Sequence, residues 1–156
     1  MKSAVSDVKV LELPVLVERR EAGGSFYMVV AFEDRAIEPW TSRLVLLREG
    51  MIRQLRVGGM SGKTLAVDRD PRIPPQERAV AEWDGQALSL TLGDVELDYL
   101  IAFFLRYVRD GYGEVLHLDL DASVRGGQGE RMDVVLQVER AGPARSPRDS
   151  RRLIGG

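Results

Sequence analysis

The chain has 156 residues, of which 44% are hydrophobic, and its 24 acidic and 22 basic side chains leave a formal net charge of −2. This balance favours neither nucleic acid nor a membrane as partner, and the lack of cysteine excludes disulfides, thiolate metal sites and cysteine nucleophiles. The single histidine excludes two-histidine zinc sites, and the lack of a signal peptide or of an apolar run of about 18 residues predicts a cytoplasmic protein.

The N-terminal part of the chain, residues 1–75, is predicted to be a mostly β module without a clear helix. Stretches rich in β-branched and aromatic residues are separated by glycine and proline, which is typical of short strands joined by turns. Glu49-Gly50 stands between two such stretches and predicts a tight hairpin. Residues 58–75 are predicted to be irregular and to end in a stiff, proline-rich connector. The expected strands are 8–13, 15–17, 25–32, 44–47 and 52–57.

The next region, residues 76–140, predicts the order strand, strand, helix, strand, strand. Asp84-Gly85 joins the first two strands and favours a type I′ hairpin turn, which needs positive φ at both central residues. Asp94 is a candidate N-cap for a helix over 95–109. The apolar stripe of this helix is broad, so we expect it to pack against its own sheet and the N-terminal strands, with Phe104 buried. The expected strands are 79–83, 86–92, 115–121 and 132–138.

Two motifs inside these regions are weak candidates for ligand sites. Gly58–Thr64 is similar to a phosphate-binding loop, but Val57 stands where that motif needs a glycine, so an ordinary loop is the favoured interpretation. Strand alternation places His117, Asp119 and Asp121 on one face, a spacing that suits a divalent metal. No second acidic cluster completes a coordination shell, and a charged contact surface is the favoured interpretation.

The composition changes from residue 141 onward to arginine and proline, which predicts a flexible tail over 141–156. The last six residues are Arg151, Arg152, Leu153, Ile154, Gly155 and Gly156. A strand-strand-helix-strand-strand unit followed by a basic and aliphatic tail with Gly-Gly resembles the ubiquitin-like proteins of the β-grasp fold. The resemblance covers about residues 78–156 and implies an α+β fold, with a β-grasp-like domain over 76–140, as in a larger bacterial member of that family.

The resemblance implies that the protein is a modifier and not an enzyme. In that family an activating enzyme uses ATP and magnesium, which this chain itself does not bind, to adenylate a carboxylate that here belongs to Gly156. A conjugating enzyme then passes the chain to amines of target proteins, and a deconjugating protease is a further implied partner. Gly155 fits a tunnel that excludes side chains, while Leu153-Ile154 and Arg151-Arg152 are the implied recognition residues. Lys63 is the best internal acceptor lysine.

Two alternatives remain open from the sequence. Sulfur-carrier relatives of the same family form a thiocarboxylate at the terminal glycine, although they are much shorter than this chain. A non-catalytic, β-rich interaction module, such as an inhibitor or scaffold subunit, would make no use of the two glycines. The sequence therefore predicts a protein that acts through partners in each of the three cases.

Overall fold

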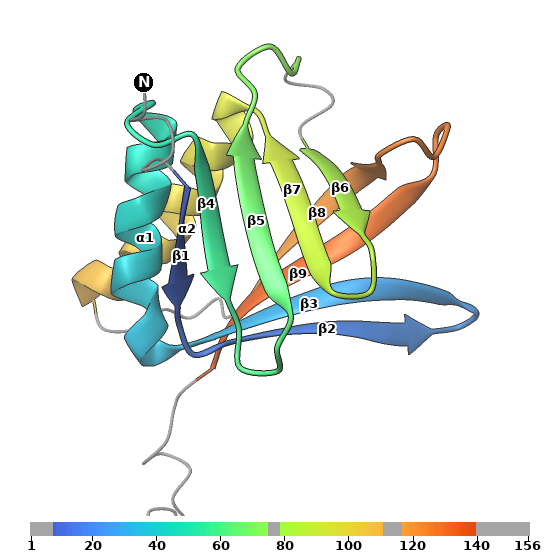
Figure 1. Ribbon diagram of the computed structural model, residues 1–156, viewed down its shortest axis with the longest axis horizontal. Helices are drawn as coiled ribbons and strands as arrows, with labels where there is room; N and C mark the ends of the chain where they lie inside the picture. Colours follow the sequence, from blue (N-terminus) through green and yellow to red (C-terminus); the bar gives the residue numbers. More distant parts are fainter. Residues whose placement is uncertain (1–7, 75–78, 111–116, 140–156) are drawn as a thin grey trace, which may run out of the picture.

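The computed structural model describes residues 8–74, 79–110 and 117–139, which form nine strands and two helices. The strands are β1 (Val8–Glu12), β2 (Val15–Ala22), β3 (Ser25–Glu33), β4 (Gln54–Gly58), β5 (Thr64–Arg69), β6 (Ala79–Trp83), β7 (Ala87–Leu92), β8 (His117–Val124) and β9 (Arg131–Glu139). The helices are α1 (Asp34–Arg48) and α2 (Asp94–Asp110). All nine strands belong to one mixed sheet in the order β1-β4-β5-β7-β6-β8-β9-β3-β2 (Figure 1). The predicted α+β class is confirmed, with a larger sheet than expected.

The predicted strand-strand-helix-strand-strand order of the C-terminal region is confirmed by β6, β7, α2, β8 and β9. The carboxylate of Asp84 accepts hydrogen bonds of 2.8 Å from the backbone N–H groups of Gln86 and Ala87, and so closes the β6–β7 turn. Gly85 alone in this turn has a positive φ, of 97°, so the type I′ turn that we expected is wrong. The Asp84-Gly85 pair therefore predicted the position of this hairpin correctly, but not its turn type.

The N-terminal region contains the strands β1 to β5, but the expectation that it has no helix is wrong, because residues 34–48 form α1. The predicted strand over 44–47 and the hairpin at Glu49-Gly50 are wrong, since the backbone N–H of Gly50 instead donates to the carbonyl of Leu47 at the end of the helix. The prediction that residues 58–75 are irregular is also wrong in part, because β5 runs through them. The buried side chains of α1 recur at helical spacing and are Ala36, Ile37, Trp40, Thr41, Leu44 and Leu47.

The sheet joins two units with the same order of elements, β2-β3-α1-β4-β5 and β6-β7-α2-β8-β9. The parallel pair β3–β9 connects the second strand of the first unit to the fourth strand of the second unit. The parallel pair β5–β7 makes the reciprocal connection. The four strands of the second unit therefore stand together in the sheet, between the β4–β5 pair and the β2–β3 pair of the first unit. The domain boundary that we predicted near residue 75 falls at residues 75–78, outside the described residues.

The sheet curls until its two edges approach each other. β1 and β2 stand at opposite ends of the strand order, yet only Leu13 and Pro14 separate them in the chain. At this corner the backbone N–H of Met60 donates to the carbonyl of Val15 over 2.9 Å. A Cβ atom on Gly59 would lie 2.7 Å from the same carbonyl oxygen, which explains why glycine occupies this turn.

One hydrophobic core connects both units and both helices. The ring of Phe104 in α2 lies 5.1 Å from that of Phe32 in β3 and 5.9 Å from that of Trp40 in α1, measured between centroids. Phe104 is fully buried, as predicted, and the expected packing of α2 against the N-terminal strands is confirmed. Neither described helix is long and apolar enough to cross a membrane.

Candidate interaction surface on the helical side

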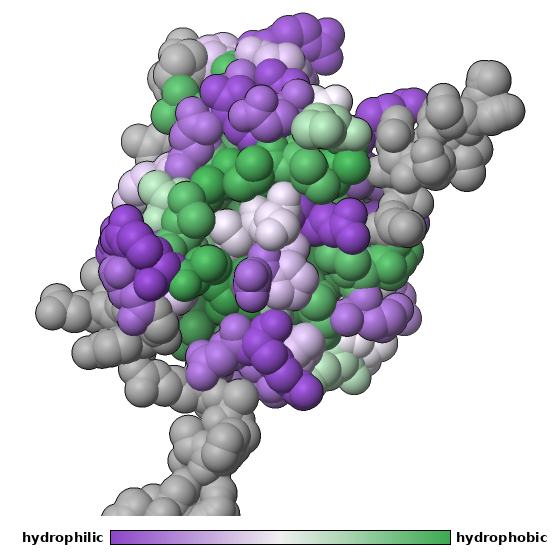
Figure 2. Space-filling model, turned by 90° about the vertical axis from the view of Figure 1, so that its left-hand side faces the viewer, coloured by the Kyte–Doolittle hydropathy of each residue, from purple (hydrophilic) through white to green (hydrophobic). Residues whose placement is uncertain are grey.

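The helices α1 and α2 lie side by side in opposite directions. Near the end of α1, the Nε atom of Arg48 donates a 2.8 Å hydrogen bond to the carboxylate of Asp98 in α2. At the other end, Asp34 in the first turn of α1 and Val108 in the last turns of α2 line the same groove. The two helices thus form one continuous side of the molecule (Figure 2).

An ion-pair cluster fixes the first turn of α2 to β5 and α1. Asp94 accepts a 2.7 Å hydrogen bond from the Nε atom of Arg69, and Arg48 lies 3.6 Å away. The hydrogen bond from Arg69 lowers the pKa of Asp94, and the charge of Arg48 adds to this effect. The N-cap position belongs to Gly93, whose carbonyl accepts the first helical hydrogen bond, so the N-cap that we predicted at Asp94 is one residue too late.

Exposed apolar side chains gather on the helices. Leu105 and Val108 of α2 are exposed, and Ile101 is partly buried against the core. The three follow each other at spacings of four and three residues, on the flank of α2 that also carries Asp98, the partner of Arg48 in α1. Val45 lies on the corresponding flank of α1, and Figure 2 shows hydrophobic patches on this side of the molecule, arranged around a paler and more polar centre. Leu105 is 43% exposed and Val108 is 40% exposed. We refer to Val45, Ile101, Leu105 and Val108 as the helical strip.

A groove with an acidic rim lies at one end of the helical strip. Asp34, Ile37, Glu38, Tyr107 and Val108 line this space of about 240 Å³, which we call the Asp34 groove. Its apolar side chains come from both helices, while both carboxylates come from α1. Within the described part of the chain, neither carboxylate takes part in an ion pair. The groove therefore combines an apolar floor with uncompensated negative charge.

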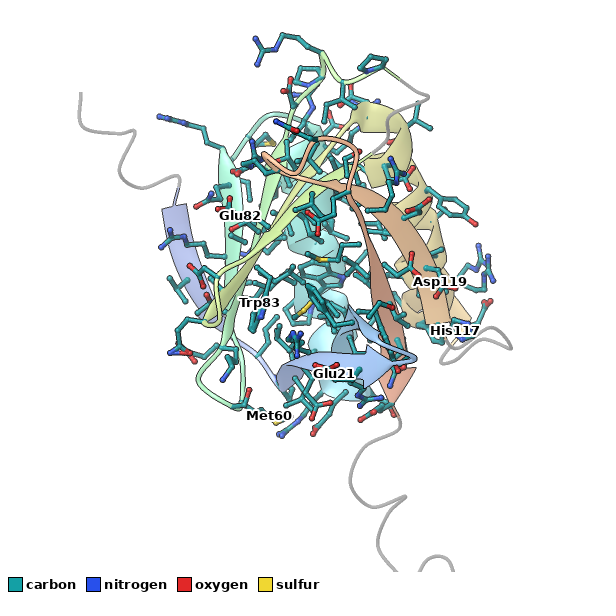
Figure 3. The ribbon with its side chains drawn as sticks, turned by 90° about the vertical axis from the view of Figure 1, so that its right-hand side faces the viewer. Glu21, Met60, Glu82, Trp83, His117 and Asp119 are labelled. Atoms are coloured by element: carbon teal, nitrogen blue, oxygen red, sulfur yellow. The ribbon has the colours of Figure 1, made fainter. Side chains whose placement is uncertain are left out.

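A second groove lies on the other flank of α2, beside the first residues of β8. We call this space of about 480 Å³ the His117 groove, and Figure 3 shows His117 and Asp119 at this edge of the molecule. Arg106 adds a positive charge to its rim, so the two grooves differ in electrostatic character. The lining residues are Tyr99, Ala102, Phe103, Arg106, His117, Leu118 and Asp119.

The predicted exposed face of β8 is confirmed, because His117, Asp119 and Asp121 all point to solvent. They do not form a common site. Asp121 forms an ion pair with Arg131 over 3.1 Å, whereas His117 and Asp119 border the groove beside α2. Nowhere in residues 8–74, 79–110 and 117–139 do three or more histidine or acidic side chains group closely enough to hold a metal ion. A charged contact surface stays the favoured prediction for these residues.

The glycine-rich segment that is similar to a phosphate-binding loop is the turn between β4 and β5. The backbone N–H of Gly59 donates to the carbonyl of Lys63 over 2.9 Å, and a strand follows where a phosphate-binding loop needs a helix. The interpretation as an ordinary loop is confirmed. Lys63, the candidate acceptor, is half-buried in this turn. The other predicted site residues, Arg151, Arg152, Leu153, Ile154, Gly155 and Gly156, lie outside the described residues.

The sequence analysis did not foresee the contribution of α1 to this surface. Asp34, Glu38 and Val45 received no role, because the chain around them was assigned to strands or loops. The spacing of Ile37, Trp40, Leu44 and Leu47 was the available signal, since the period of three to four residues is helical. This helical spacing begins at Ile37, ahead of the short apolar run 44–47 that we interpreted as a strand.

Comparison with known proteins adds no family to this description. No protein-family model matches the chain, and no curated protein matches its sequence. Any functional inference therefore depends on the shape and charge of the helical strip and its two neighbouring grooves.

Proposed function

We propose that the protein is a non-catalytic interaction module whose helical side binds an apolar segment of a partner protein. The observation that supports this proposal is the concentration of exposed apolar side chains on two adjacent helices. Most of the exposed large hydrophobic residues in the described chain belong to them, namely Val45, Val95, Tyr99, Leu105 and Val108. A concentration of exposed apolar side chains on one side of a protein is typical of sites that bind other proteins.

The charges around the helical strip indicate the chemistry of the partner. Asp34 and Glu38 place two carboxylates without an ion-pair partner among the described residues beside the apolar floor formed by Ile37 and Val108. The last turn of α2 adds the partial negative charge of a helix C-terminus. A partner segment with apolar anchors next to lysine or arginine complements both features, and the opposite charges also accelerate encounter.

Selection from a library of short random peptides displayed on phage tests this proposal. We expect the selected peptides to carry at least two large apolar residues beside a basic residue. Leu105→Arg should weaken their binding about 10- to 100-fold, since it removes the burial of one leucine side chain. Met51→Arg is the matched control, because Met51 is an exposed apolar residue outside the strip. Equal binding to the wild type and to Leu105→Arg would refute the proposal.

The element order of residues 79–139 favours a second candidate, a ubiquitin-like modifier with a β-grasp-like domain. Gly156 would supply the acyl group to an activating enzyme that consumes ATP and magnesium, and a conjugating enzyme would transfer it to target amines. This candidate needs Gly156 to be the terminal residue of the mature protein, which intact mass spectrometry can measure. Incubation with lysate, ATP and magnesium should then yield adducts on other proteins, whereas exchange of one oxygen for sulfur would indicate a sulfur carrier.

A further inference from the structure

The Asp34 groove lies beside the point at which β9 ends. Glu139, the last residue of β9, is the register partner of Glu33 in β3. The next residue along the chain from Glu33 is Asp34, which lines the groove. Neighbouring strands are about 4.8 Å apart, and consecutive Cα atoms are about 3.8 Å apart, so the chain leaves the sheet within about 10 Å of the groove.

The sequence after β9 contains a segment whose chemistry matches this groove. Arg151-Arg152 followed by Leu153-Ile154 combines two positive charges with two aliphatic side chains. Arg151 lies twelve positions after Glu139, a length of chain that spans at most about 40 Å when extended. The segment can therefore reach the groove on its own molecule without any change in the described fold.

Charge selects the Asp34 groove over the His117 groove, which is equally close to the end of β9. His117 is the register partner of Gln137 in β9, so a segment that follows β9 can reach either groove. The rim of the His117 groove carries both Arg106 and Asp119, so it has no excess of negative charge to attract a pair of arginines. Asp34 and Glu38 attract them, and the C-terminal turn of α2 beside the groove also favours cations.

We propose that residues 151–154 bind in cis to the Asp34 groove, with Leu153 and Ile154 on its apolar floor and the two arginines at its acidic rim. This inference rests on the proposed function in one respect, because it names a ligand for one end of that surface. A partner that binds there must displace the segment. Its apparent affinity is then reduced by the fraction of molecules in which the groove is open.

Disulfide trapping in the full chain tests this contact, since the chain has no cysteine of its own. Leu153→Cys is combined with Val108→Cys in the groove or with Met60→Cys as a control. Met60 is 55% exposed, and its backbone N–H donates to the carbonyl of Val15 in β2. Val15 pairs with Phe32 in β3, and Phe32 pairs in turn with Val138 in β9. Two strand spacings, about 10 Å, thus separate Met60's contact point from β9, so both cysteines are within reach of the segment.

We expect the disulfide with Val108→Cys to form at least about tenfold faster than that with Met60→Cys, as a monomeric product on a non-reducing gel. Changing residues 151 and 152 to glutamate should abolish this preference, and adding Asp34→Arg and Glu38→Arg should restore it. Equal rates for the two pairs, a preference that ignores charge reversal, or disulfide-linked dimers as the main product would overturn the proposal. None of these outcomes bears on the peptide selection with Leu105→Arg, so failure of cis binding and failure of the proposed function are distinguishable.

Discussion

Phe104 is the residue whose removal most directly tests the shared core. Its side chain has no exposed surface, and its ring contacts those of Phe32, Trp40 and Phe103 at centroid distances of 5.1, 5.9 and 4.9 Å. Phe32 belongs to the first ββαββ unit and Phe104 to the second, so this contact connects the two units. Phe104→Ala removes the ring and leaves a cavity that such a closely packed interior fills only in part.

The expected loss of stability is large. Replacing a buried phenylalanine with alanine costs about 3–5 kcal/mol in all, and the loss lies toward the upper end of this range where the ring also takes part in several aromatic pairs. With three such pairs, we expect a free energy of unfolding that is about 4–5 kcal/mol lower. For a chain of this size the melting temperature should fall by roughly 10–20 °C. If this variant does not fold, Phe104→Leu should show a smaller loss of about 1–2 kcal/mol.

Urea unfolding followed by circular dichroism and tryptophan fluorescence measures this loss. Tyr99→Ala is the matched control, because Tyr99 is an aromatic residue of the same helix that is 57% exposed, and it should change stability by less than about 1 kcal/mol. We expect a single transition by both probes, since Trp40 in α1 and Trp83 in β6 belong to different units but pack in one core. A loss below about 2 kcal/mol for Phe104→Ala, or two separate transitions in the wild type, would refute the reasoning.

Three further predictions concern single residues. Arg69 lowers the pKa of Asp94 in the folded protein, so Asp94→Asn should cost about 1 kcal/mol at neutral pH. This difference should shrink as the pH falls from the ordinary pKa of an aspartate through the lowered pKa, and a difference as large in strong acid as at neutral pH would contradict the assignment. Gly59→Ala should cost about 1–3 kcal/mol in thermal unfolding, because its Cβ would clash with a backbone carbonyl, whereas Ser61→Ala in the same turn should be neutral. If the protein is a modifier, deletion of Gly156 should abolish ATP–pyrophosphate exchange by its activating enzyme, since it moves the carboxylate by about 3.3–3.6 Å, and intact exchange would exclude that function.

Local signals were sufficient for the elements of the C-terminal region. The turn at Asp84-Gly85 satisfies its own backbone through one carboxylate, and glycine at residue 93 precedes the helix that contains Phe104. Strict alternation in β8 also correctly separated the exposed His117 and Asp119 from the buried Leu118. These features depend on residues a few positions apart, so a sequence pattern reports them directly.

The helix α1 shows where a local pattern becomes ambiguous. The run Leu44 to Leu47 is short and apolar, which suits a strand as well as a buried helix, and Pro39 argues against a helix interior. Pro39 removes one helical hydrogen bond, but the buried side chain of Trp40 packs 4.7 Å from the ring of Phe32. Tertiary packing thus outweighs the local preference, and a window of sequence does not contain that contribution.

The sequence by itself determined the α+β class, the C-terminal elements and which side of β8 is buried. Only the tertiary structure decided the neighbours of each strand and therefore the location of the candidate site. The parallel pair of Glu33 and Glu139 joins residues more than one hundred positions apart and brings the end of β9 next to the start of α1. The physical reason is that the backbone groups of a strand edge can pair with many other strands, whereas alternation specifies only a face. The common core, which buries Phe32 against Phe104, selects one arrangement among them.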